Sequence, residues 1–151
     1  MGKVGKISNK MLFIATVENH LISFYIPFMK YLQSEGYEIH IATKLGEKEE
    51  EFKKQEIVCH NVDFSRSVNS FSALMSLRQL IGLMRKNDFT LIHVHTPIAA
   101  FLGRLTSKLA QTRPVLYTAH GFIFIRVHLG IIGLLFTQLN ILQQDGPMVL
   151  L

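Results

Sequence analysis

The stretch Lys10–Thr16, with the sequence KMLFIAT, decides the fold because it predicts a buried β-strand. Its apolar run has no polar alternation, which is typical of a strand covered on both faces. The stretch Glu38–Thr43 (EIHIAT) predicts a second strand. Between them, His20–Glu35 predicts a helix, and Pro27 inside it indicates a kink or a late start. The apolar residues whose spacing predicts this helix are Leu21, Phe24, Phe28, Tyr31 and Leu32.

The alternation of strand and helix continues along the chain. Further strands are predicted at Ile57–Val62, Leu91–His95 and Val115–Ala119. Further helices are predicted at Gly46–Gln55, from Ser70 or Ser72 to Asn87, and at Pro97–Gln111. Four repeats of this alternation predict an α/β fold with a doubly wound, Rossmann-like parallel sheet and helices on both faces. Right-handed crossovers favour the strand order 3-2-1-4-5.

The predicted helix that ends at Asn87 has two differently composed sides. Its basic residues Arg78, Arg85 and Lys86 are expected to face water. Its apolar stripe is expected to face the core and consists of Leu74, Leu77, Leu80, Ile81 and Met84.

Composition indicates one globular domain. The chain has 151 residues, of which 48% are hydrophobic and 18% charged, which suits a packed core and excludes a disordered chain. The single cysteine, Cys59, excludes a disulfide framework and a thiolate zinc site, and we expect it to be a small buried residue. The net charge of +5 favours anionic partners.

We divide the chain into a basic extension at 1–9, a Rossmann-like domain at 10–122 and an apolar tail at 123–151. The longest apolar run of the tail, Leu129–Phe136, is shorter than the roughly 20 residues that a membrane-spanning helix needs. We therefore expect an interfacial or buried helix there.

Polar residues follow the carboxyl ends of the predicted strands. In an open parallel sheet, ligands bind beyond these ends, where the strand order reverses. The sequence therefore predicts a site between the first and fourth strands. The glycine-rich phosphate motif G-x-G-x-x-G is absent after the first strand, which argues against a self-contained dinucleotide-binding domain. The candidate site residues are Glu18, Asn19, His20, Arg66, His95, Thr96, His120 and Gly121.

The histidines at this edge are the candidate catalytic and ligand-binding side chains. His120 follows the fifth strand, where an imidazole can act as a general base or bind a sugar hydroxyl or a phosphate, and Gly121 permits close approach of a ligand. The alternative is that His120 is a loop histidine without a functional role. His93, His95 and His120 could form a three-histidine metal site. We favour the reading of His93 as a hydrogen-bonded core histidine, and no metal is expected.

Several segments together resemble one enzyme family. The sequence resembles the start of the family 4 glycosyltransferases of the GT-B fold, especially bacterial enzymes of capsular and exopolysaccharide assembly. The resemblance covers about residues 10–122. The segments that carry it are Lys10–Thr16, His20 with Phe24 and Pro27-Phe28, Gly36–Thr43, Val62–Ser67, Leu91–Pro97, Gly103-Arg104 and Tyr117–Phe122.

The resemblance implies two Rossmann-like domains that face each other across a cleft. The N-terminal domain would hold the acceptor, and the C-terminal domain would bind a nucleotide-sugar donor. It implies transfer with retention of configuration and no cofactor. His120 matches the family's active-site histidine, and Glu18-Asn19-His20 matches the loop near the donor phosphates, although glycines are missing from it here.

The implied partners are a nucleotide-sugar donor and a lipid-linked saccharide acceptor in cell-surface polysaccharide synthesis. We expect a cytoplasmic protein with peripheral contact at the inner face of the membrane, and no nucleic-acid binding.

The family's donor-binding elements have no counterpart in these 151 residues, and the likeness fades after about Arg126. We therefore expect an incomplete enzyme, from a truncated or frameshifted reading frame, that is inactive alone. One alternative is a non-catalytic Rossmann-like binding module that works with a separate partner chain. Another is half of a sugar-nucleotide epimerase, which would need other carboxylates than Glu18 and Asp63 at the cleft.

Overall fold

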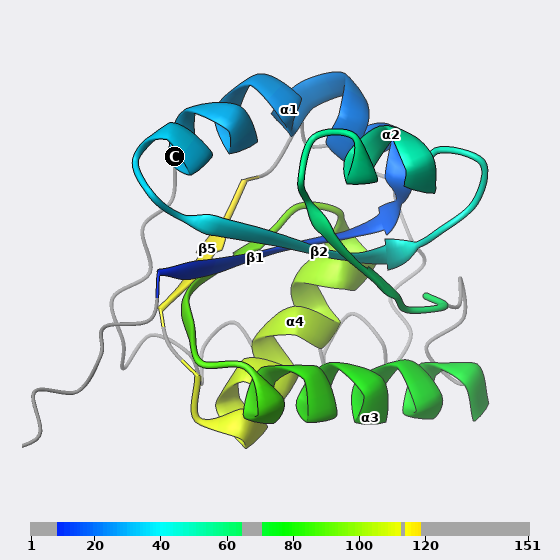
Figure 1. Cartoon of the computed structure of the whole chain (residues 1–151). Helices are drawn as coiled ribbons and strands as arrows, with labels where there is room; N and C mark the ends of the chain where they lie inside the picture. Colours follow the sequence, from blue (N-terminus) through cyan, green and yellow to red (C-terminus); the bar gives the residue numbers. More distant parts are fainter. Residues whose placement is uncertain (1–8, 65–70, 113, 119–151) are drawn as a thin grey trace, which may run out of the picture.

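A computed structural model describes residues 9–64, 71–112 and 114–118, in which strands and helices alternate (Figure 1). The strands are β1 (Lys10–Val17), β2 (Glu38–Lys44), β3 (Val58–Asn61), β4 (Phe89–Val94) and β5 (Val115–Tyr117). The helices are α1 (Glu18–Ser34), α2 (Glu49–Lys53), α3 (Phe71–Lys86) and α4 (Pro97–Ala110). All neighbouring strands pair in parallel, in the order β3-β2-β1-β4-β5. The predicted fold class and strand order are confirmed.

Strand β1 lies at the centre of the sheet because its side chains are apolar on both faces. It pairs with β2 on one side and β4 on the other. Leu12 and Ile14 belong to one buried cluster, whereas Phe13 and Ala15 belong to the other. This division follows from the alternation of side chains along a strand.

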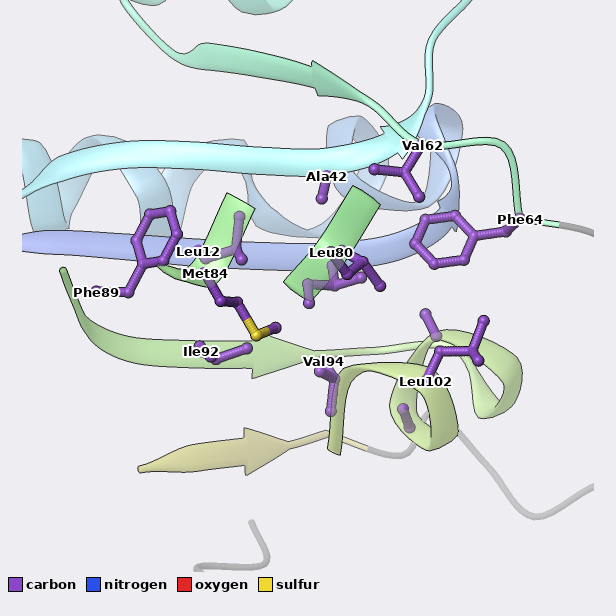
Figure 2. Packing of buried hydrophobic residues seen from close by; sticks show 13 residues of the cluster. Leu12, Ala42, Val62, Phe64, Leu80, Met84, Phe89, Ile92, Val94 and Leu102 are labelled. Carbon is purple, nitrogen blue, oxygen red and sulfur yellow. The ribbon is translucent and has the colours of Figure 1, made fainter. Parts of the chain in front are cut away.

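Each face of the sheet is covered by its own pair of helices. In Figure 1, α1 and α2 lie above the sheet, and α3 and α4 lie below it. Figure 2 shows the core on the lower side, where Leu80 and Met84 of α3 pack against Leu12 and Ile92 of the sheet. Helix α4 comes close to the sheet at Gly103, which has no side chain to hold it away.

The element bounds differ from the prediction by a few residues. The largest difference is at α2, which is a five-residue helix, Glu49–Lys53, instead of Gly46–Gln55. Strand β4 begins at Phe89 rather than Leu91, because Phe89 pairs with Lys10. Pro27 lies inside α1 without ending it.

The predicted apolar stripe of α1 was partly wrong. Leu21 and Leu32 are buried, but Phe24, Phe28 and Tyr31 are exposed. The helix packs through a neighbouring stripe with the same spacing. Its buried members are Leu21, Tyr25, Met29 and Leu32.

On α3, the prediction that Arg78, Arg85 and Lys86 face water is confirmed, because all three are exposed. Leu74 was wrongly assigned to the core and is exposed. Cys59 is half-buried, so its expected burial is only partial. None of the described helices is long and apolar enough to cross a membrane.

Candidate functional site

The carboxyl ends of the strands carry side chains that tie neighbouring loops together. Glu18, the first residue of α1, accepts hydrogen bonds from the backbone N–H groups of Gly46 (2.8 Å) and Lys48 (3.2 Å). Its carboxylate thus holds the loop after β2 against the end of β1. Beside this clamp, Lys44 and Asp63 form an ion pair at 3.1 Å between the ends of β2 and β3.

A second tie joins β1 to the start of α4. The Thr96 hydroxyl accepts a hydrogen bond from the backbone N–H of Thr16 at 3.1 Å. The next residue back, His95, donates its backbone N–H to the carbonyl of Ile14 at 3.0 Å. These bonds fix the switch point between β1 and β4, where ligands bind in open parallel sheets.

Below this edge lies a cluster of three histidines with Tyr25 and Phe13, on the side of the sheet covered by α1. The His95 ring is buried and lies 3.9 Å from the Tyr25 ring, 4.1 Å from the His93 ring and 5.8 Å from the His20 ring, measured between centroids. It also stacks on Phe13 at 5.7 Å with an interplanar angle of 11°. His20 and His95 are thus neighbours near the switch point, but the His95 ring is buried instead of exposed at the rim as predicted.

Thr118 is the last described residue after β5 and connects two members of this cluster. His93 Nε2 lies 2.8 Å from the Thr118 hydroxyl, which confirms His93 as a buried, hydrogen-bonded histidine. Burial raises the pKa of the Tyr25 hydroxyl, and its hydrogen bond with Thr118 acts in the opposite direction. Sequence reasoning missed Tyr25 because the predicted apolar stripe of α1 did not include it.

The predicted site residues therefore fall into different groups. Glu18 and Thr96 hold loops together, and Asn19 is exposed in the first turn of α1. The predicted residues Arg66, His120 and Gly121 lie outside the described part of the chain, so their roles stay predictions.

The described ranges contain no group of three or more His, Cys, Asp or Glu side chains placed to hold a metal ion. What this edge does offer is imidazole and phenol groups beneath a surface fixed by Glu18 and Thr96. Such groups can donate to or accept from the hydroxyl groups of a polar ligand.

Comparisons with known proteins agree with this architecture. The family model described as "Glycosyl transferase 4-like" matches residues 10–136. EpsD of Bacillus subtilis (strain 168), named as a glycosyltransferase, is 34% identical over 124 residues, which cover 78% of this chain and 30% of EpsD. An Escherichia coli UDP-Gal:alpha-D-GlcNAc-diphosphoundecaprenol alpha-1,3-galactosyltransferase is 32% identical over 59 residues, 39% of this chain and 15% of that protein.

Solved structures show the same fold. A glycosyltransferase from Rickettsia africae superposes with a TM-score of 0.72 and 19% identity, over 95% of this chain and 37% of that one. Anabaena Alr3699/HepE, solved in complex with UDP and glucose, gives a TM-score of 0.59 and 18% identity over 85% of this chain and 34% of that one. The chain thus spans about a third of the length of these proteins.

Proposed function

Because the chain belongs to the glycosyl transferase 4-like family, we propose that it forms the acceptor-side half of an enzyme that transfers a sugar from a nucleotide-sugar to a lipid-linked saccharide. The match over residues 10–136 carries this proposal, and the Escherichia coli relative, named for a diphosphoundecaprenol acceptor, supports the choice of acceptor. The relatives do not favour the alternative of a non-catalytic binding module.

In this proposal, the acceptor binds over the switch point between β1 and β4. The half-buried His20 lies there, next to the buried ring of His95, and the loops around it are held by Glu18 and Thr96. His120 acts near the donor sugar as a proton-transfer or hydrogen-bonding group, and Gly121 lets that sugar approach. The product belongs to a cell-surface polysaccharide, and transfer retains the anomeric configuration.

The family resemblance implies that transfer also needs a donor-binding half, and the region matched here covers 30% of EpsD. The 151-residue chain alone should therefore show no turnover of a nucleotide-sugar. The experiment is a chimera in which residues 10–136 replace the matching part of EpsD. Sugar transfer to an undecaprenyl-diphosphate-linked saccharide is then measured with and without the substitution His120→Ala.

We expect His120→Ala to lower turnover of the chimera by roughly 10²- to 10⁴-fold, the usual contribution of a positioned acid–base group. The thermal unfolding midpoint should stay unchanged if His120 is a site residue. Full turnover by the variant would contradict the role of His120. Turnover by the unfused 151-residue chain would contradict the need for a second half.

The acceptor side can be tested separately by NMR on the 151-residue chain. Addition of a short-chain prenyl-diphosphate saccharide should shift the side-chain resonances of His20 and His95 more than those of His40 and His60, which lie together elsewhere on the sheet. Equal shifts at both histidine pairs, or none at either, would contradict acceptor binding at the switch point.

A further inference from the structure

Thr118, the residue directly after β5, is held by two side chains on the face of the sheet covered by α1. His93 Nε2, on β4, lies 2.8 Å from the Thr118 hydroxyl. The Tyr25 hydroxyl, on α1, is hydrogen-bonded to the same side chain. The Thr118 backbone N–H donates to the carbonyl of Val94 at 3.2 Å. The backbone and the side chain of Thr118 are therefore both fixed by neighbouring elements.

The two side-chain partners of Thr118 have little freedom to move. Tyr25 is 7% exposed and His93 is 4% exposed. The His93 ring packs near the rings of Phe13, Tyr25 and Phe28, with centroid separations of 5.2, 5.6 and 6.3 Å. A ring in such a close-packed environment cannot change its rotamer without displacing its neighbours. Tyr25 and His93 thus form a rigid support under Thr118.

The hydroxyl of Thr118 can serve both partners at once. A threonine hydroxyl has one proton to donate and two lone pairs that accept. If Thr118 donates to His93 Nε2, it can accept the proton of the Tyr25 hydroxyl. If His93 Nε2 carries a proton, Thr118 accepts that proton and can donate to the Tyr25 oxygen. Either arrangement depends on the hydroxyl, so a valine of the same shape would lose both hydrogen bonds.

Strand β5 needs this support because its own pairing is short. It has three residues, Val115–Tyr117, and lies at the edge of the described sheet, where it pairs with β4. His120 follows Thr118 by two residues, and two residues of chain span at most about 7 Å. A shift of Thr118 can therefore reach the backbone of His120 directly.

We propose that Tyr25 and His93 are positioning residues that act through Thr118 to set the place of His120, a role that rests on the function proposed above for His120. Neither side chain has to touch a substrate, because both are buried beneath the edge of the sheet. Loss of their hydrogen bonds should therefore lower kcat and leave the KM for the acceptor unchanged. The expected size is large, because a catalytic group misplaced by about 1 Å can cost about a hundredfold in rate.

The test compares variants of the EpsD chimera described above. Thr118→Val should lower kcat roughly 10- to 100-fold, whereas Thr118→Ser keeps the hydroxyl and should retain most of the turnover. Tyr25→Phe removes one of the two hydrogen bonds and should lower kcat by a smaller factor. The matched control is Thr106→Val on α4, whose buried hydroxyl bonds to the carbonyls of Leu102 and Gly103 in its own helix. Its turnover should be unchanged.

A double-mutant cycle with His120→Ala separates positioning from general destabilisation. If Thr118 acts through His120, Thr118→Val should cause no further loss of kcat in the His120→Ala chimera. An equal loss of kcat with and without His120 would overturn the proposal. So would an equal loss in Thr118→Val and Thr106→Val, or a higher KM with an unchanged kcat.

The role of His120 and its positioning can fail separately. Full turnover of the His120→Ala chimera would overturn both. A loss of turnover in His120→Ala without one in Thr118→Val would overturn the positioning alone.

NMR on the 151-residue chain gives a readout that needs no turnover. The ring resonances of His120 should move in Thr118→Val and in Tyr25→Phe and keep their positions in Thr106→Val. Circular dichroism checks that each variant is folded. Unchanged His120 resonances in both Thr118→Val and Tyr25→Phe would contradict the proposal.

Discussion

A chain of hydrogen bonds links three residues of β2 and β3 on the face of the sheet covered by α3. His40 Nε2 lies 2.8 Å from the Glu38 carboxylate, and His40 Nδ1 lies 2.9 Å from His60 Nε2. The two imidazole planes differ by 8° at a centroid separation of 5.2 Å. Only one proton fits between the two facing nitrogens. The pair therefore accepts a single added proton more easily than two.

Protonation should weaken this part of the fold. Burial lowers the pKa of His60 to about 4, and the positive charges of His40 and Lys86 act in the same direction. Burial also lowers the pKa of His40, although the hydrogen bond to Glu38 opposes this and Lys10 supports it. The unfolded chain, with an ordinary histidine pKa of 6.5, binds the proton more tightly than the folded chain. The stabilisation is thus present above pH 6.5 and is lost as the pH falls toward 4.

A lowering of the pKa from 6.5 to about 4 corresponds to about 3 kcal/mol at most. Because His60 is half-buried, solvent screening reduces the expected effect to about 1–2 kcal/mol. The test is His60→Gln, which keeps a hydrogen-bonding side chain but cannot titrate. Urea unfolding across this pH window should show that the wild-type chain loses about 1–2 kcal/mol more than the variant. Parallel losses in the two proteins would refute this reasoning.

Three further substitutions and one control test contacts at the candidate site and in the core. Glu18→Ala should lower the free energy of unfolding by about 1–2 kcal/mol in urea titrations, because it removes an acceptor from two backbone N–H groups. His93→Ala should cost about 1–3 kcal/mol through lost packing and a lost hydrogen bond to Thr118, measured in the same way. Gly103→Ala should lower the free energy of unfolding by about 1–2 kcal/mol, because a Cβ there would lie 2.6 Å from Val94 Cγ1. The control is Gly82→Ala on α3, where a Cβ has open space around it. This substitution should raise the free energy of unfolding by about 0.5–1 kcal/mol. If Gly103→Ala stabilises as much as Gly82→Ala, the close packing of α4 is wrong.

The sheet could be predicted because its signals are local. An apolar run such as Lys10–Thr16 is too short for a helix and needs cover on both faces, so it indicates a buried strand. Once five such runs alternate with helices, the handedness of crossovers leaves few strand orders. The observed order, β3-β2-β1-β4-β5, is the one predicted from these two signals.

The orientation of the helices could not be predicted in the same way. Helix α1 contains two apolar stripes with the same spacing, one with Tyr25 and Met29 and one with Phe24 and Phe28. Periodicity is identical for both, so only the docking of the helix on the sheet decides which stripe is buried. The exposed Leu74 of α3 has the same cause.

The candidate site was likewise predictable in part: the sequence gives the position of its residues but not their hydrogen-bond partners. Sequence position places Glu18 and Thr96 at the carboxyl edge, but their partners, Gly46 and Thr16, are 28 and 80 residues away along the chain. Polar side chains at this edge therefore include some whose hydrogen bonds hold the loops. Substrate contact is better sought in the half-buried His20, whose ring lies 5.8 Å from that of the buried His95. A ligand placed there would rest on loops that Glu18 and Thr96 have already fixed, so its binding would cost little ordering of the backbone.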